Sequence, residues 1–325
     1  MKKTYPLILA MVLFFSCQTE IDVSIPTYYN KLVVEGYIEN DQYPMVSLYR
    51  SVPYFSTMSL SLEYLMDSII IQDAKVSVTT SKGDKHDLFL SFSLQAPLLF
   101  VYTTNAFKGE VNTSYSLQIE WNDKVYTSET AILNTFDLDS VKFVPNFGHT
   151  EIDSIANLRI WMTDDGKPNN YYQFMVKKSY VFNDKPFSDR LWVSTIPAAF
   201  DNSPFRGIGF NYEIIRGSPS PFFLPPDMDE QERRRYFRMD YRLGDTVYLK
   251  YARLEESAYR FWQSAGGEIT FGQNPFMSPT PIISNIKCNT GEKCLGAWCG
   301  SAAKEVVLIF DSTTSKASCS TLGFR

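Results

Sequence analysis

Cys17 is the residue of this 325-residue chain whose surroundings most clearly specify a chemistry. Two lysines, an apolar run from Pro6 to Phe15 and the small residue Ser16 precede it. The run is shorter than the roughly 20 apolar residues that a membrane-spanning helix needs, but it suits a secretory signal. A small residue directly before the cysteine resembles a lipobox, where the thiol is acylated and the preceding peptide bond is cut. An ordinary secretory signal with an incidental cysteine is the alternative.

Cleavage before Cys17 would divide the N-terminus into a lipoprotein signal peptide (residues 1–16) and a lipidated tether (residues 17–30). A thioether-linked diacylglycerol together with an amide-linked chain such as palmitate makes a multi-chain anchor. Two or more chains attach a protein stably, whereas a single chain binds marginally. No later apolar run reaches membrane-spanning length. We therefore expect a protein that sits on a membrane through its lipids and does not cross it.

The other four cysteines lie near the C-terminus: Cys288, Cys294, Cys299 and Cys319. In an oxidising compartment an even set predicts two disulfides, with three possible pairings. A metal cluster and free thiols are the alternatives. The spacing matches no zinc pattern well, and neither histidine is close in sequence. We expect no metal and no cofactor.

No recognisable catalytic motif accompanies the cysteines. His86 and His149 stand in loop-like sequence, and the chain has no nucleophile elbow, His-Glu-x-x-His motif, phosphate-binding loop or dinucleotide fingerprint. Asp164, Asp165 and Gly166 lack the ligand spacing of a calcium loop and predict a turn. The sequence therefore favours a protein that is not an enzyme. A surface hydrolase built from two carboxylates distant in sequence is the alternative.

The candidate binding residues are aromatic and basic. The Pro-, Gly- and Phe-rich segment 183–226 is longer than an ordinary loop and predicts a packed or binding loop. The arginines that follow suit an anionic ligand, a lipid headgroup or an acidic partner, with a solvated helix face as the alternative. The net charge of −5 argues against nucleic acid. The candidate partner- or ligand-binding residues are Phe222, Phe223, Arg233, Arg234, Arg235, Arg238 and Trp298.

The elements that must position these residues are mainly strands. Aromatic residues make up 15% of the chain, and short segments of alternating polarity recur from Lys31 onward. The clearest hairpin joins 115–121 to 124–127 through Asn122-Asp123. We predict a mainly β protein with an N-terminal Ig-like or transthyretin-like β-sandwich over residues 31–136. A second β-rich domain with one or two short helices and a C-terminal cysteine loop is predicted over residues 137–325.

Two helices are expected in the second domain. Asp227, with Glu230 three residues later, predicts a capping box at the start of the first helix, which carries the arginines. The second helix is predicted from Glu255 to Ala265, where Gly266-Gly267 would end it.

Several segments together resemble a known family over nearly the whole mature chain. The segments are Cys17 with Ile21-Asp22, Leu32–Asp41, Tyr43–Ser51, Asp73–Val78, Asn169–Tyr172, Leu243–Val247, Tyr259–Trp262 and Ile283–Ile286. They are similar to the Bacteroidota lipoprotein family catalogued as domain of unknown function 4249 (DUF4249). The chain departs from this family at Cys288–Cys299, where members usually have a short Gly-rich strand.

The resemblance implies an outer-membrane lipoprotein that faces the cell exterior. Glu20 and Asp22 resemble the acidic signal that sends such lipoproteins to the surface, with a solvated linker as the alternative. The implied role is a non-catalytic accessory or ligand-capture partner of a TonB-dependent receptor, which is an outer-membrane β-barrel. A structural subunit of an outer-membrane protein assembly or secretion complex is the alternative.

Overall fold

The computed structural model describes residues 30–52, 61–145, 155–220, 224, 227–271 and 281–311. The described part from Lys31 onward belongs to one compact unit, Lys31–Arg325. The expected signal peptide and nearly all of the expected tether lie outside the described residues, and with them Cys17, Glu20 and Asp22.

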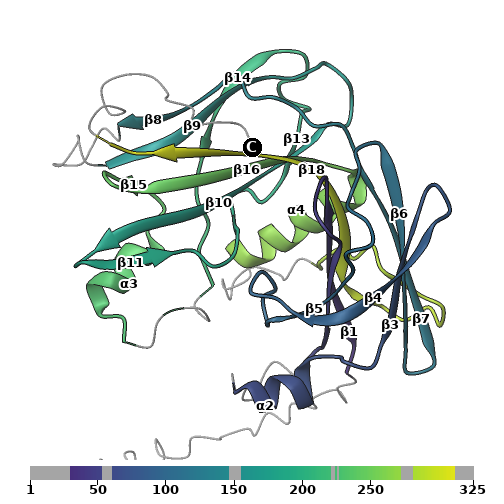
Figure 1. Cartoon of the computed structure of the whole chain (residues 1–325). Coiled ribbons are helices and arrows are strands. Elements are labelled where there is room, and N and C mark those ends of the chain that lie inside the picture. The colour runs from purple at the N-terminus through teal and green to yellow at the C-terminus, as the bar shows by residue number, and fades with distance from the viewer. Residues whose placement is uncertain are drawn as a thin grey trace, which may run out of the picture. The chain divides into compact units, whose positions relative to one another are not determined.

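Strands make up most of the regular structure, which confirms the predicted mainly β class (Figure 1). The strands are β1 (Leu32–Glu39), β2 (Met45–Arg50), β3 (Lys75–Thr80), β4 (Lys85–Phe92), β5 (Phe100–Thr103), β6 (Thr113–Trp121), β7 (Lys124–Ile132), β8 (Ser140–Pro145), β9 (Ile155–Thr163), β10 (Tyr171–Phe182), β11 (Lys185–Ser188), β12 (Val193–Ser194), β13 (Phe200–Asp201), β14 (Gly209–Ile214), β15 (Tyr241–Arg242), β16 (Thr246–Leu254), β17 (Lys287–Cys288) and β18 (Leu295–Ile309). The helical segments are α2 (Leu62–Tyr64), the π-helical turn η1 (Leu65–Ile69), α3 (Glu230–Phe237) and α4 (Glu256–Phe271).

The N-terminal strands form a β-sandwich around one hydrophobic core. In β6 every second side chain is buried, because successive side chains of a strand point to opposite faces. β6 and β7 pair along their whole length, and Asn122 and Asp123 between them both have positive φ. A two-residue turn of this kind matches the right-handed twist of its strands, so the predicted hairpin is confirmed. The core joins residues of β1 and β2 with residues of β3, β6 and β7.

One path of hydrogen-bonded strands connects the N-terminal and C-terminal halves. Its order is β11-β10-β16-β18-β1-β2-β5-β4-β3-β6-β7-β17, with β12 and β13 paired to β10. β4 makes the corner, since its first half pairs with β3 and its second half with β5. A second sheet, β14-β9-β15 with β8 paired to β9, packs against β10, β16 and β18 (Figure 1). The core between these layers includes Leu158, Phe174 and Leu249.

Strand β18 ties the two cores together. Its first part pairs parallel with β1, and its second part pairs antiparallel with β16. Gly300 allows β18 to cross close to β7, because a Cβ there would lie 2.5 Å from the carbonyl oxygen of Ala131. The sequence places a domain boundary after residue 136. The structure has two large hydrophobic cores, one on each side of this boundary, but one sheet runs across the boundary within one compact unit.

Helix α3 begins two residues later than predicted. The Asp229 side chain accepts a hydrogen bond from the Glu232 amide at 2.8 Å, and Glu232 Oε2 accepts one from the Asp229 amide at 2.9 Å. This is a capping box with the predicted spacing but a different register, so the box predicted at Asp227 and Glu230 is wrong.

Helix α4 continues past the glycine pair that was predicted to end it. Gly266 packs against Ala198, and a Cβ at Gly266 would come within 2.7 Å of the Ala198 side chain. The glycine therefore serves a close contact inside the helix. In the described part of the chain, no helix is long and apolar enough to cross a membrane.

Candidate ligand-binding site

A change of strand partner creates the candidate site. β8 pairs with one edge of β9, and the registers of β14 and β15 place both on the other edge, end to end. β14 pairs as far as Leu158 and β15 reaches Ala156, so Asn157 lies where the partner changes. Leu158 and Ala156 are buried in the core, whereas the Asn157 side chain between them points to the outer face. A pocket opens at this position.

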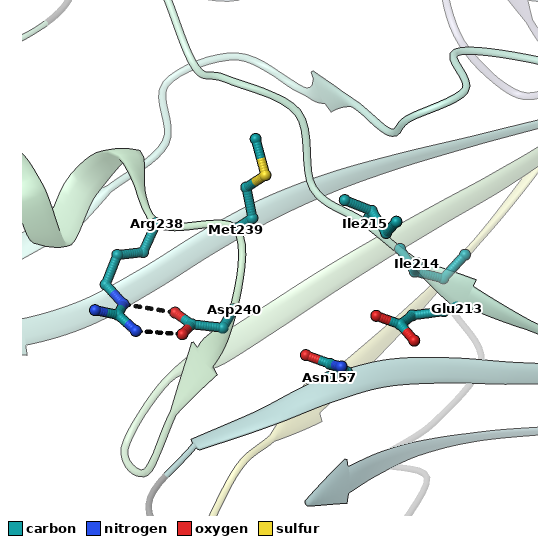
Figure 2. A pocket seen from close by; sticks show the side chains of 7 residues that line it. All are labelled: Asn157, Glu213, Ile214, Ile215, Arg238, Met239 and Asp240. Carbon is teal, nitrogen blue, oxygen red and sulfur yellow. Dashed lines mark hydrogen bonds and ion pairs between the residues drawn. The ribbon is translucent and has the colours of Figure 1, made fainter. Parts of the chain in front are cut away.

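The pocket combines charged and apolar groups (Figure 2). Its volume is about 340 Å³, near the lower end of the range of roughly 300–1,000 Å³ that is usual for small-molecule sites. Ile215 and Met239 expose 38% and 50% of their surface beside the charged groups. The lining residues are Asn157 of β9, Glu213 and Ile214 of β14, the following Ile215, and Arg238, Met239 and Asp240 between α3 and β15.

The charged groups of the pocket are held in pairs. Arg238 Nε donates to Asp240 Oδ1 at 2.7 Å, and Arg238 Nη2 donates to Asp240 Oδ2, which makes a bidentate pair (Figure 2). Burial raises the pKa of Asp240, but Arg238 outweighs it and holds this pKa below its ordinary value. Glu213 Oε2 accepts a hydrogen bond from Arg159 Nη2 at 3.1 Å. The pairs fix carboxylates and guanidinium groups around the pocket before a ligand arrives, which lowers the entropy cost of binding.

Behind the wall that carries Arg238 lies a buried ionic cluster. Arg216 Nη1 donates to the carbonyl oxygens of Tyr236 and Arg238 at 3.1 and 3.4 Å, and Lys178 Nζ donates to that of Arg238 at 3.4 Å. Asp189 accepts hydrogen bonds from Arg216 Nη2 at 2.6 Å and from the Lys178 amide at 2.8 Å. These bonds fix the backbone where α3 ends and the pocket wall begins. The cluster comprises Lys178, Asp189, Arg216, Arg235 and Asp245.

Among the described residues, the buried ionic cluster contains one more cation than anions. Arg216 pairs with Asp189 and Arg235 pairs with Asp245, which leaves Lys178 as the third cation. Lys178 is fully buried. Burial, and to a smaller extent repulsion by Arg216, lowers the pKa of Lys178 to about 7. An amine that titrates near neutral pH therefore lies directly behind the pocket wall.

This arrangement suits binding. The pocket offers a guanidinium, two carboxylates, an amide and exposed apolar side chains, and none of the described residues that line it carries a hydroxyl, thiol or imidazole. Such a set can orient a small ligand, or a segment of a partner, that carries both charged and apolar parts. Within the described ranges, no group of three or more His, Cys, Asp or Glu side chains is arranged to hold a metal ion.

The four arginines predicted as contacts have different positions. Arg233 and Arg234 lie on the exposed face of α3, where Arg234 pairs with Glu230 of the preceding turn. Arg235 is buried and pairs with Asp245, so it belongs to the buried ionic cluster and is not a surface contact. Arg238 is the one of the four that lines the pocket.

Trp298 was predicted to contact a partner or ligand at the surface, but the structure places it in the interior. It is fully buried in the N-terminal core, and its Nε1 donates to the carbonyl oxygen of Tyr115 at 3.2 Å. The difference arises because Trp298 belongs to strand β18 and not to a cysteine-bearing loop. The aromatic candidates Phe222 and Phe223 lie outside the described residues.

The described cysteines, Cys288, Cys294 and Cys299, are free thiols in the structure, whereas the sequence predicts two disulfides. Cys299 belongs to a small core cluster with residues of α4, whereas Cys294, with Cys288 packed beside it, belongs to the N-terminal core. The number of cysteines predicts disulfides, but it does not reveal that Cys299 lies in a different core from Cys288 and Cys294. Cys319 lies outside the described residues.

Sequence reasoning missed most of the pocket. Asn157, Glu213, Ile215, Met239 and Asp240 belong to no motif, and the pocket arises from a change of strand partner that is not visible along the chain. The one available signal was Asp240 two residues after Arg238, which is a spacing that allows a local ion pair.

Comparisons with known proteins place the chain in a family but do not assign an activity. A crystal structure of a DUF4785 family protein from Legionella pneumophila is 10% identical, with a TM-score of 0.20 over 68% of this chain. This chain covers 52% of that protein's chain. No curated protein matches. The model of the family described as "Domain of unknown function (DUF4249)" matches residues 18–305, and the chain belongs to this family.

Proposed function

We propose that this chain is a non-catalytic binding protein, anchored to the outer membrane by lipids on Cys17 and facing the cell exterior. There it captures a ligand for, or assists, a TonB-dependent transporter. The observation that carries the binding role is the pocket at the junction of β14 and β15, which places charged and apolar groups side by side without a reactive set. The lipobox-like sequence before Cys17 supports the anchor, and the resemblance of the family to receptor partners supports the transporter.

The anchor and the pocket complement each other physically. A pocket of about 340 Å³ accommodates a small contact, which by itself gives modest affinity. A lipid anchor confines the protein to the same membrane as its partner, so that their contact has an effective concentration of up to about the millimolar range. Weak but oriented binding is then sufficient for capture or assistance.

A pull-down from the native envelope in mild detergent tests the proposal. The full-length protein should recover an outer-membrane β-barrel of the TonB-dependent class. Repeated recovery of the chain alone would count against a barrel partner. A deletion strain adds a second readout, because a growth defect on one nutrient supports capture. Broad loss of outer-membrane proteins would instead support an assembly subunit.

Cys17→Ser should release the protein from the membrane fraction, because the serine hydroxyl cannot receive the thioether-linked lipid. Fractionation followed by immunoblotting measures the effect, and the mass of the purified protein reports the missing lipid. Ser16→Ala is the matched control, since it keeps a small residue before the cysteine and should leave the protein membrane-bound. Full membrane retention of Cys17→Ser contradicts the proposed anchor.

Arg238→Ala should lower recovery of the partner by about tenfold or more, as expected for removing a charged group at the centre of a binding site. The carbonyl oxygen of residue 238 that Arg216 and Lys178 use is retained in this variant. The matched control is Arg234→Ala, which removes a guanidinium from the exposed face of the preceding helix α3 and should have no effect. Equal recovery by both variants would exclude the pocket as the contact, provided their thermal melting matches that of the wild type.

A further inference from the structure

The segment that carries Cys288 runs along the free edge of β7 like a strap; residues 286–294 are called the strap below. Its short strand β17 pairs with β7 at Lys287–Thr127 and Cys288–Tyr126. The next residue continues the contact, because the Asn289 amide donates to the Val125 carbonyl oxygen at 2.9 Å. The strap therefore covers backbone groups at the end of the sheet, where an uncovered edge strand invites pairing with other chains.

Side chains hold the far end of the strap on the same strand. Glu292 Oε2 accepts a hydrogen bond from Lys124 Nζ at 2.7 Å, and Glu292 Oε1 accepts one from the Tyr126 hydroxyl at 3.0 Å. Both partners belong to β7, so the strap is fixed at its start by backbone pairing and at its end by Glu292.

A tight turn brings two thiols together inside the strap. The Gly291 amide donates to the Cys288 carbonyl oxygen at 3.0 Å, and Gly291 has a φ of +77°. Lys287 then forms a bridge with Lys293, so the strap folds back on itself. Because Cys288 follows Lys287 and Cys294 follows Lys293, this bridge puts both cysteines on the same face of the strap, where Cys294 belongs to the N-terminal core and Cys288 packs against it. Cys294 is 8% exposed, and Cys288 is the more accessible of the two.

Cys299 lies in different surroundings. It is 3% exposed and packs in the cluster that contains Ala258 and, partly buried, Trp262. Cys299 is only five residues after Cys294, but it belongs to a different core cluster from Cys294 and Cys288. Burial raises the pKa of the Cys299 thiol well above its ordinary range, which keeps it unreactive.

We propose that Cys288 and Cys294 form an oxidisable dithiol, which an external disulfide converts to one intramolecular bond, while Cys299 stays a thiol. The oxidant belongs to the class of glutathione disulfide and disulfide oxidoreductases. This inference does not depend on the proposed binding role. The sequence predicts two disulfides with three possible pairings, whereas this proposal specifies one bond, between Cys288 and Cys294.

The reaction follows thiol–disulfide exchange. The Cys288 thiolate attacks one sulfur of the oxidant, which forms a mixed disulfide and releases the first oxidant thiolate. Cys294 then loses its proton to solvent, and its thiolate attacks the Cys288 sulfur of the mixed disulfide. This step forms the Cys288–Cys294 bond and releases the second oxidant thiolate. Two cysteine thiols are oxidised, and the oxidant disulfide is reduced to two thiols. Cys288 reacts first because it is the more exposed of the two thiols. Cys294 is less reactive, because burial, and to a smaller extent the neighbouring Cys288, raises its pKa to about 11.

The bond would close the turn at Gly291 and hold the strap in the folded-back shape that pairs with β7. Reduction would leave the strap held by its hydrogen bonds and by the Lys124–Glu292 pair, which is exposed enough to contribute little. Oxidation should therefore slow hydrogen exchange of the Val125 amide, which donates to Asn289 Oδ1 at 3.1 Å. Equal exchange rates in the two forms would overturn the strap-holding role.

Peptide mass mapping tests the pairing. Purified full-length protein is incubated with glutathione disulfide or with dithiothreitol, denatured, alkylated with iodoacetamide and digested with trypsin without reductant. Cleavage after Lys287, Lys293 and Lys304 separates Cys288 from Cys294. After oxidation the peptides 288–293 and 294–304 should appear joined, with Cys299 alkylated. A further chymotryptic cut after Leu295 or Trp298 separates Cys294 from Cys299 and identifies the bonded residue in the wild type itself.

Matched variants sharpen the result. Cys299→Ser should keep the joined peptides, and Cys294→Ser should lose them. Joined peptides in Cys294→Ser, a bond from Cys288 or Cys294 to the peptides of Cys17 or Cys319, or alkylation of both Cys288 and Cys294 after oxidation would each overturn the proposal. The wild-type digest decides the pairing even if a variant fails to fold.

Discussion

Replacing Asp164 with alanine is expected to lower the free energy of unfolding by about 3–5 kcal/mol, because it leaves several buried donors without an acceptor. Asp164 is 3% exposed. Its carboxylate accepts hydrogen bonds from Tyr172 Oη at 2.6 Å, Asn170 Nδ2 at 3.1 Å, Asn202 Nδ2 at 3.0 Å and the Gly207 amide at 2.9 Å. One side chain thus ties the turn after β9 to β10 and to the loop before β14.

Asp165→Ala is the matched control for this prediction. Asp165 is the next residue, but its side chain is 36% exposed and its contact with Arg253 is 3.4 Å long. Asp165 also accepts hydrogen bonds from Asn170 Nδ2 at 2.6 Å and from the Lys167 amide at 3.1 Å, but Asn170 keeps its bond to Asp164 when Asp165 is removed. The loss should therefore be about 1 kcal/mol, clearly smaller than for Asp164. Chemical denaturation monitored by fluorescence measures both variants. Equal losses for Asp164→Ala and Asp165→Ala would refute the central role of Asp164.

The pH dependence of Asp164 provides a second check. Burial raises its pKa, but the hydrogen bonds from Tyr172, Gly207, Asn170 and Asn202 outweigh burial and hold the pKa well below its ordinary value. The stabilisation by Asp164 is therefore complete above about pH 4, where the unfolded carboxyl ionises, and is lost as pH falls toward the folded pKa. Asp164→Asn should remove this part of the acid sensitivity.

Local patterns predicted the fold class because they depend on the strand itself. The alternation of β6 and the turn at Asn122-Asp123 determine which side chains are buried and where the hairpin reverses, and both were correct. The parallel pairing of β1 with β18 could not be predicted in this way, since the two strands are separated by most of the chain. That pairing, and not local sequence, joins the two predicted domains in one sheet.

The candidate site was harder to predict for the same reason. The arginine-rich sequence drew attention to the right region, but residue type alone cannot distinguish Arg235, buried against Asp245, from Arg238, which lines the pocket. The direction of each side chain depends on the register of α3, and the capping box was predicted two residues too early. The buried ionic cluster also gave no signal, because Lys178 and Arg216 stand in otherwise ordinary strand and loop sequence.

Lys178→Met is expected to raise the free energy of unfolding at pH 7 by about 1–4 kcal/mol, the range seen when buried charges are replaced by apolar groups of similar volume. Lys178 is fully buried and is the cation in excess of the pairs Arg216–Asp189 and Arg235–Asp245. Its removal leaves two cations and two anions. Among the described residues, the hydrogen bond that Lys178 Nζ donates is the 3.4 Å contact with the Arg238 carbonyl oxygen, so little hydrogen bonding is lost.

The pH dependence distinguishes this cause from a general packing effect. The pKa of Lys178 is about 7 in the folded protein, below the value of 10.5 for an unperturbed lysine. Between these values the unfolded chain binds more protons than the folded chain, so wild-type stability should rise with pH by up to about 1.4 kcal/mol per unit. Above about pH 10 the effect reverses, because burial raises the pKa of Tyr180 and Tyr241 and favours ionisation of these tyrosines in the unfolded chain.

Denaturation curves at pH values from 7 to about 8.5 therefore test the prediction, because above this range the buried thiols of Cys294 and Cys299, whose pKa values are raised, oppose the rise. The wild type should gain stability across this window, Lys178→Met should not, and the two should converge toward the alkaline end. Lys178→Arg is the matched control, because arginine keeps its charge throughout and should be less stable than the wild type with no rise. Parallel curves for the wild type and Lys178→Met would show that the amine is not the titrating group. Convergence would instead show that a single uncompensated charge behind the pocket wall limits the stability of the fold near neutral pH.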